Sequence, residues 1–175
     1  RKMIANQVGN RYAEAIYEIA DSTGKIKEVY EVLNSLMELY KNDKEFKTFI
    51  THPLIELDEK KKVLKEIYKD TDDSIVDIIF YIMDKNRINF IRSIVAEYLK
   101  IYYLRNSILD VEATFASEPS DAQQNKLIEK LEKKTGKKVK LAIKIDKSII
   151  GGGIIKIGDT VMDGSIRKEL EALRK

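Results

Sequence analysis

The chain of 175 residues contains no cysteine and no tryptophan, one histidine and two prolines. The absence of cysteine excludes disulfides, thiol nucleophiles and cysteine-ligated zinc, and it fits a reducing compartment. No stretch approaches the ~18 apolar residues of a membrane-spanning helix, and the start does not have the pattern of a signal peptide. We therefore expect a protein without direct membrane insertion.

Residues that carry catalytic chemistry are also few. His52 precedes Pro53 in an expected loop and has no second histidine with which to form a metal site or a triad, so a structural or solvent-facing role is favoured. The glycines at 151–153 are followed by a strand pattern and not by the Gly-Lys-Ser/Thr of a phosphate loop, which indicates a bulge or a close backbone crossing. Asp72 and Asp73 stand at a helix start, where a capping role is expected. We therefore expect no enzyme, no metal and no cofactor.

A change in composition divides the chain near residues 106–110. Residues 1–108 contain 18 basic and 18 acidic side chains, whereas residues 109–175 contain 14 and 11. All nine tyrosines lie in the first part, and six of the eight glycines lie in the second. Such a break is typical of a domain boundary, and it predicts domains at 1–108 and 109–175.

Apolar residues recur at steps of three and four through the first part, which predicts helices. Asp43 and Asp58 are expected N-caps, and the residue before Pro53 is expected to end a helix. The connections are short, so the helices should form a compact six-helix bundle. The expected helices lie at about residues 4–23, 26–41, 43–50, 58–68, 73–83 and 88–108.

Two of these helices carry more apolar surface than one core requires. Between Ile75 and Met83 only Asp77 is charged, so apolar residues surround the helix axis. The first helix combines small and apolar side chains, namely Ala13, Ala15, Ile16, Tyr17, Ile19 and Ala20. Either both helices are interior, or they border a groove that accepts an amphipathic helix from a partner.

From residue 109 onward the apolar period changes to two, which predicts strands. The expected order is a strand at 109–115, a helix capped by Ser120, a strand at 138–145, and two strands at 154–157 and 160–162 around a Gly158-Asp159 turn. Ser165 is expected to cap a final helix. The predicted fold is therefore mostly α, with an N-terminal six-helix bundle followed by a small α+β C-terminal domain.

Two lysine clusters could bind nucleic acid by neutralising phosphates. They lie at residues 60–62 and 133–138, but acidic residues flank both, and Phe115 is the only aromatic residue of the second part. Without a row of aromatic rings there is no platform on which bases could stack, so solvated faces are favoured. A basic α+β module that binds nucleic acid remains as the alternative function.

Three segments carry a resemblance to a known family. The residues at 10–20, Asn-Arg-Tyr-Ala-Glu-Ala-Ile-Tyr-Glu-Ile-Ala, resemble the opening helix of the delta subunits of bacterial F-type ATP synthases, the counterparts of the mitochondrial oligomycin-sensitivity-conferring protein. The glycine-containing segment 146–159 and the Asp-Gly-Ser within 161–167 resemble the family's closing signature, and Asn86-Arg87-Ile88 resembles its step into the sixth helix. Residues 117–120 depart from the more apolar stretch that the family shows there.

This resemblance implies a non-catalytic connector that resists rotor torque during proton- or sodium-driven ATP synthesis. It places the chain at the cytoplasmic side of the bacterial inner membrane, as a peripheral part of the complex. It implies that N-terminal helical tails of alpha subunits bind the bundle, one of them in a groove lined by Tyr12, Ala15, Ile16, Ile19, Ile78, Tyr81 and Ile82. It also implies that b subunits of the peripheral stalk bind the C-terminal domain, with candidate contacts at Ile149, Ile154, Val161 and Ile166.

Overall fold

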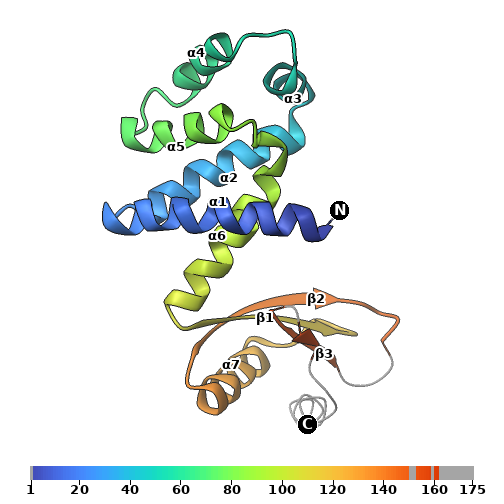
Figure 1. Cartoon of the computed structure of the whole chain (residues 1–175). Helices are drawn as coiled ribbons and strands as arrows, with labels where there is room; N and C mark the ends of the chain where they lie inside the picture. The colour runs from blue at the N-terminus through green and yellow to red at the C-terminus, as the bar shows by residue number, and fades with distance from the viewer. Residues whose placement is uncertain (1, 150–152, 159, 162–175) are drawn as a thin grey trace. The chain divides into compact units, whose positions relative to one another are not determined.

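The computed structural model describes residues 2–149, 153–158 and 160–161 (Figure 1). The chain divides into two compact units, of which the first comprises residues 1–102 and the second begins at Tyr103. Within the described residues the fold is mostly helical with one small sheet, as the sequence predicts. The domain limits 1–108 and 109–175 stay a prediction.

Some helices of the first unit begin at the predicted capping residue, and one begins elsewhere. Asp43 caps α3 by accepting a hydrogen bond from the Phe46 amide at 3.0 Å, and Asp72 caps α5. The prediction that Asp58 caps α4 is wrong: this helix begins at Leu57, and Asp58 lies in its first turn. The helices are α1 (Lys2–Ser22), α2 (Ile26–Asn42), α3 (Lys44–Thr51), α4 (Leu57–Ile67), α5 (Asp73–Asp84), a 3-10 turn η1 (Ile88–Phe90) and α6 (Ile91–Arg105).

The turn after α5 depends on Asn86, whose φ of 54° lies in the left-handed region. The Arg87 amide donates to the Ile82 carbonyl at 3.0 Å, and the Asn86 amide donates to the Met83 carbonyl at 3.0 Å. This pair of bonds is a Schellman motif, which asparagine tolerates better than most residues other than glycine. The predicted sixth helix at 88–108 therefore starts with the 3-10 turn η1 and ends at Arg105.

The core of the helical unit contains a buried tyrosine hydroxyl. The Tyr98 side chain is fully buried, and its hydroxyl donates a hydrogen bond to the Ile26 carbonyl at 2.7 Å. Burial raises the pKa of Tyr98, so the hydroxyl stays protonated and keeps its role as a donor. The bond connects α6 with the first turn of α2. The Tyr98 ring also packs against the rings of Tyr17 and Tyr30, with centroids 5.3 and 6.3 Å from its own.

Helices α1 and α6 cross at Gly9 and Ser93. A Cβ atom at Gly9 would lie 2.1 Å from Ser93 Oγ and 2.8 Å from the Ser93 carbonyl carbon, distances at which atoms overlap. The Ser93 hydroxyl also donates to the Ala5 carbonyl at 2.7 Å. Glycine is required here because only a residue without a side chain lets the two backbones approach this closely.

In its described residues, the second unit forms a mixed sheet that packs against the helix α7. The strands β1 (Ile108–Phe115) and β2 (Lys138–Ile145) are parallel and are connected through α7 (Asp121–Thr135). Strand β3 (Gly153–Ile157) pairs antiparallel with β1, and β4 (Thr160–Val161) pairs antiparallel with β3, giving the order β2-β1-β3-β4. One sheet face packs with α7 around a small core of Val111, Ala113, Phe115, Leu127, Leu131 and Ile155.

The helix and turns of this unit follow the sequence prediction closely. Ser120 caps α7 in a capping box with Gln123, and Gly136 ends the helix with a left-handed φ of 70°. Ile157 pairs with Thr160, so two residues connect β3 and β4, and Gly158 has a φ of 58°. The final helix predicted from Ser165 lies outside the described residues.

Strand β2 lies at the edge of the described sheet, because β1 is the only strand paired with it there. Its outward side chains include Lys138, Lys140 and Lys144, all exposed. Lys144 Nζ lies 3.4 Å from a carboxylate oxygen of Glu112 on the neighbouring strand. The outer face of the sheet therefore mixes both signs of charge.

Candidate functional site

The seven residues predicted to line a groove lie on α1 and α5, and we call them the α1/α5 surface. The rings of Tyr12 and Tyr81 connect the two helices, with centroids 5.8 Å apart and planes inclined by 48°. Ile16, Ile78 and Ile82 belong to the same hydrophobic core, and Tyr12 packs against it. Because Tyr12 is the middle residue of α1 and Tyr81 lies near the end of α5, the middle of one helix meets the C-terminal end of the other.

Burial separates the α1/α5 surface into two rows. Ile16, Ile78 and Ile82 are only 1, 6 and 0% exposed, so they form a floor that is part of the core. Ile19 and Tyr81 are 49 and 41% exposed, Ala15 is exposed and Tyr12 is half-buried. The two helices are thus interior on one side and present apolar side chains to solvent on the other, and only this second row offers surface to a partner.

A shared spacing explains why apolar side chains follow both helices. On α1, Val8, Tyr12, Ala15 and Ile19 recur at steps of four, three and four residues. On α5 the same steps align Ser74, Ile78 and Tyr81 with the C-cap residue Lys85. Residues at these steps share one face of a helix. This face of α5 therefore has a polar residue at each end, with the buried Ile78 and the exposed Tyr81 between them.

An ion pair joins the loop after α1 to the N-terminus of α5. Lys25 and the Asp72 carboxylate form a close contact on the surface. The Lys25 ammonium lowers the pKa of Asp72 far below its ordinary value, and the bonds that the carboxylate accepts from Ser74 act in the same direction. The carboxylate therefore stays ionised and serves as the helix cap and the ion-pair partner together.

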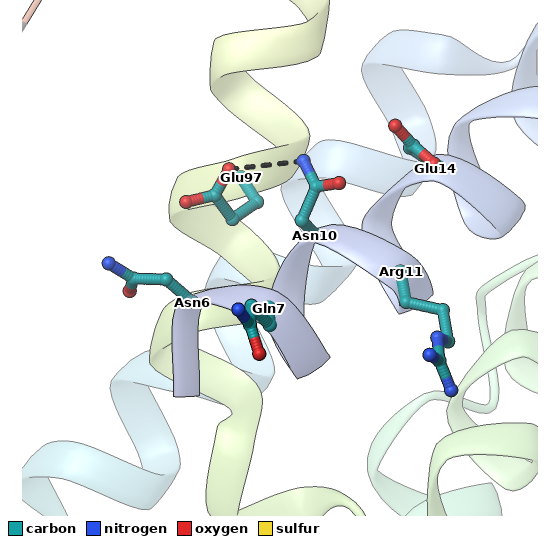
Figure 2. A pocket seen from close by; sticks show the side chains of 6 residues that line it. All are labelled: Asn6, Gln7, Asn10, Arg11, Glu14 and Glu97. Atoms are coloured by element: carbon teal, nitrogen blue, oxygen red, sulfur yellow. Dashed lines mark hydrogen bonds between the residues drawn. The ribbon is translucent and has the colours of Figure 1, made fainter. Parts of the chain in front are cut away.

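A polar depression of about 510 Å³ lies on another side of α1, next to α6 (Figure 2). Asn10 donates a hydrogen bond to Glu97 at 3.3 Å, and the ammonium of Lys100 lies 3.5 Å from the same carboxylate. Glu97 is 9% exposed, so these contacts satisfy a nearly buried charge. Sequence periodicity does not indicate this depression, because it depends on where α6 crosses α1. Its other lining residues are Asn6, Gln7, Arg11 and Glu14.

The residues predicted to contact b subunits are only partly described. Ile149 is half-buried, and Ile154 in β3 is 39% exposed on the outer face of the sheet. Val161 is in β4, and Ile166 lies outside the described residues. Of the two side chains whose exposure is described, Ile154 is therefore the more exposed.

The features expected to be structural have identifiable contacts. His52 Nδ1 accepts a hydrogen bond from the Leu54 amide at 3.1 Å, which closes the turn after α3. Gly153 begins β3 opposite Phe115, while the other two glycines of that run lie outside the described residues. Across the described ranges no three side chains gather that could ligate a metal ion, and no helix is long and apolar enough to cross a bilayer.

A mostly helical protein with a small mixed sheet and an apolar surface shared by two helices is typical of a protein-binding subunit. The chain belongs to the ATP synthase delta (OSCP) subunit family, whose model matches residues 8–175. The resemblance seen in the sequence is thereby confirmed, and the family is that of a non-catalytic subunit with a role in ATP synthesis.

Named relatives cover nearly the whole chain. It is 60% identical to the ATP synthase subunit delta, sodium ion specific, of Propionigenium modestum, over 99% of both chains. It is 58% identical to the protein of the same name from Ilyobacter tartaricus, again over 99% of both. It is 33% identical to an ATP synthase subunit delta of Clostridium botulinum, over 94% of this chain and 93% of that protein.

A solved structure shares the fold. A chain in the structure of the Toxoplasma gondii mitochondrial ATP synthase hexamer superposes with a TM-score of 0.69, covering 95% of this chain and 94% of that one. The sequence identity is 21%, so the likeness shows the fold alone.

Proposed function

We propose that this chain connects the catalytic head of an F-type ATP synthase to its peripheral stalk. Helices α1 to α6 act as the six-helix N-terminal domain and hold the N-terminal helical tails of alpha subunits, one of them on the α1/α5 surface. The second unit binds the ends of the b subunits. The complex holds the chain as a peripheral component at the cytoplasmic side of the membrane.

The observation that carries this proposal is the exposed apolar row beside a buried floor. Ile19 and Tyr81 leave 49 and 41% of their surface in water, although each neighbours residues that are fully buried. Fully burying a large apolar side chain is worth about 1.5–3 kcal/mol, so covering the exposed halves of both provides on the order of 2 kcal/mol. An amphipathic helix laid along the row would supply that cover.

The mechanical task explains why such a surface suits a connector. Torque from a rotating central stalk would turn the catalytic head with it unless the head were held. If the head turned, the energy of rotation would be lost and not used for ATP synthesis. A holding contact must dissociate slowly, and affinity among related interfaces is tuned mostly through the dissociation rate. Burial of apolar side chains gives this without any bond chemistry.

For the b-subunit contact the supporting observation is smaller. Ile154 is 39% exposed on a sheet face that also presents Lys144 and Lys156. An apolar side chain with lysines nearby fits a partner helix that has an apolar stripe and acidic residues beside it. Ile149, Val161 and Ile166 stay candidates for the same contact.

The test is calorimetric titration of the whole chain with a synthetic peptide of the alpha-subunit N-terminal tail. Ile19→Asp, Ala15→Asp and Tyr81→Asp each place a charge in the exposed row and should abolish measurable binding. Ile67→Asp and Ala96→Asp are matched controls, because Ile67 is 44% exposed on α4 and Ala96 is exposed on α6. Both control variants should bind as the unaltered chain does.

Folding is followed by far-UV circular dichroism, so that loss of binding is separated from loss of structure. Unchanged titrations with folded Ile19→Asp and Tyr81→Asp chains would remove the α1/α5 surface from the proposal. The alternative function, binding of nucleic acid through the basic strands, predicts instead an affinity for DNA or RNA that falls steeply with added salt.

A further inference from the structure

Two cationic side chains lie at one end of the α1/α5 surface. Lys85 Nζ is 6.0 Å from the centre of the Tyr81 ring, and Arg87 Cζ is 6.0 Å from the centre of the Tyr12 ring. Because the two rings contact each other, both cations flank the same aromatic pair. The exposed apolar row therefore ends against a pair of positive charges.

The backbone fixes the position of this pair. The left-handed Asn86 turns the chain sharply after α5, and the Arg87 guanidinium donates to the Lys85 carbonyl at 3.1 Å. Arg87 is half-buried, so its side chain has less freedom than a fully exposed arginine. A charge held in place loses less entropy when a partner binds it.

Within the described part of the chain, no ion pair neutralises the positive charge of Lys85 and Arg87. The nearest acidic residue in the sequence, Asp84, lies 2.6 Å from Lys61 Nζ and is thereby directed toward α4. Among the residues that the structure describes, no carboxylate forms an ion pair with Lys85 or Arg87. The two charges are thus available to an incoming group.

The charge changes sign along the surface. The N-cap Asp72 and the first turns of α5 carry three carboxylates, at Asp72, Asp73 and Asp77, and Lys25 pairs with the first of them. The C-terminal end of α5 is followed by Lys85 and Arg87. A bound helix with the same charge at both ends would meet repulsion at one of them, so this gradient can distinguish partners.

We propose that Lys85 and Arg87 select the tail that binds the α1/α5 surface, by pairing with carboxylates at the end of the tail helix seated against Tyr12 and Tyr81. The inference rests on the proposed function and adds to it the charge pattern of the partner. The occupant is an amphipathic alpha-subunit tail and not a small anion, because the cations adjoin an apolar row that only an extended apolar ligand would cover.

The experiment uses three synthetic helical peptides with one apolar stripe and with two glutamates, two glutamines or two lysines at the same end. Each is titrated into the whole chain at low and high salt. The glutamate peptide should bind about tenfold more tightly than the lysine peptide, and the difference should shrink as salt screens the exposed pairs.

Charge reversal separates this selection from a general attraction. In Lys85→Glu/Arg87→Glu the order of the peptides should invert, and Lys85→Glu alone, at an exposed position, should give part of the effect while the fold is kept. Lys62→Glu/Lys65→Glu on α4 makes the same change in net charge at exposed positions and should leave the order unaltered.

The outcomes distinguish the two proposals. If all three peptides bind equally and Ile19→Asp still abolishes their binding, the α1/α5 surface binds helices and the charge selection is wrong. If the control pair Lys62→Glu/Lys65→Glu inverts the order as well, the selection belongs to net charge and the inference is overturned. If no peptide binds, the proposed function of this surface fails together with it.

Discussion

Replacing Gly9 by alanine should destabilise the helical unit, although alanine is the better helix former. The added Cβ would lie 2.1 Å from Ser93 Oγ, 2.7 Å from Ser93 Cβ and 2.8 Å from the Ser93 carbonyl carbon. A hydroxyl can rotate away, but a carbonyl carbon can move only with α6 itself. The substitution therefore forces two packed helices apart.

The size of the effect follows from two opposing terms. Overpacking a well-packed site costs about 1–3 kcal/mol, and contact with backbone places Gly9→Ala in the upper half of that range, at about 2–3 kcal/mol. The gain in helix propensity from glycine to alanine is about 1 kcal/mol. The expected net loss is therefore about 1–2 kcal/mol, or roughly 4–16 °C in midpoint temperature for a domain of ~100 residues.

Urea and thermal denaturation followed by far-UV circular dichroism measure this loss, because helices dominate that signal. Asn6→Ala, at an exposed position of the same helix, is the control and should change the stability by no more than about 0.5 kcal/mol. A Gly9→Ala chain as stable as the unaltered one, or more stable, would refute the close crossing of α1 and α6.

Two further predictions concern polar groups of the helical unit. Tyr98→Phe leaves the Ile26 carbonyl without its donor and should cost about 1–2 kcal/mol in urea denaturation, whereas Tyr30→Phe, which removes a half-buried hydroxyl, should cost less than about 0.5 kcal/mol; equal losses would contradict the role of that bond. Because Lys25 lowers the folded-state pKa of Asp72, this carboxylate stabilises the fold above its unfolded pKa of about 3.9, and the stabilisation is lost as the pH falls below that value. Asp72→Asn should therefore weaken the acid dependence of the thermal midpoint, and an unaltered acid slope would show that the pair contributes nothing.

Local signals were sufficient for much of the fold. Asp43 and Ser120 are predicted caps because each precedes a helix and has a side chain that can accept from an amide three residues later, and both bonds are present. The strand at 138–145 follows from strict alternation alone. Asp58 was misleading because a good capping residue also suits the first turn, where its carboxylate faces the positive end of the helix dipole.

The features that the sequence does not predict are those that depend on contacts between residues far apart along the chain. Periodicity identifies the apolar excess of α1 and α5, but it does not distinguish Ile16, which is 1% exposed, from Ile19, which is 49% exposed. Their difference arises from which neighbouring helix covers each. The need for glycine at position 9 has the same origin, since Ser93 approaches it from a helix that begins more than eighty residues later.

The lysines along β2 have a consequence for the newly synthesised chain before it has bound its partners. A strand with an unpaired edge can form hydrogen bonds with the same strand of another copy, and such pairing leads to aggregation. Pairing of two β2 strands from different copies would bring Lys138, Lys140 and Lys144 of both copies together and remove water from them. This is energetically costly, so the lysines oppose such pairing. The lysines of β2 can thus be understood as a protection against aggregation during biosynthesis, with no nucleic acid required to explain them.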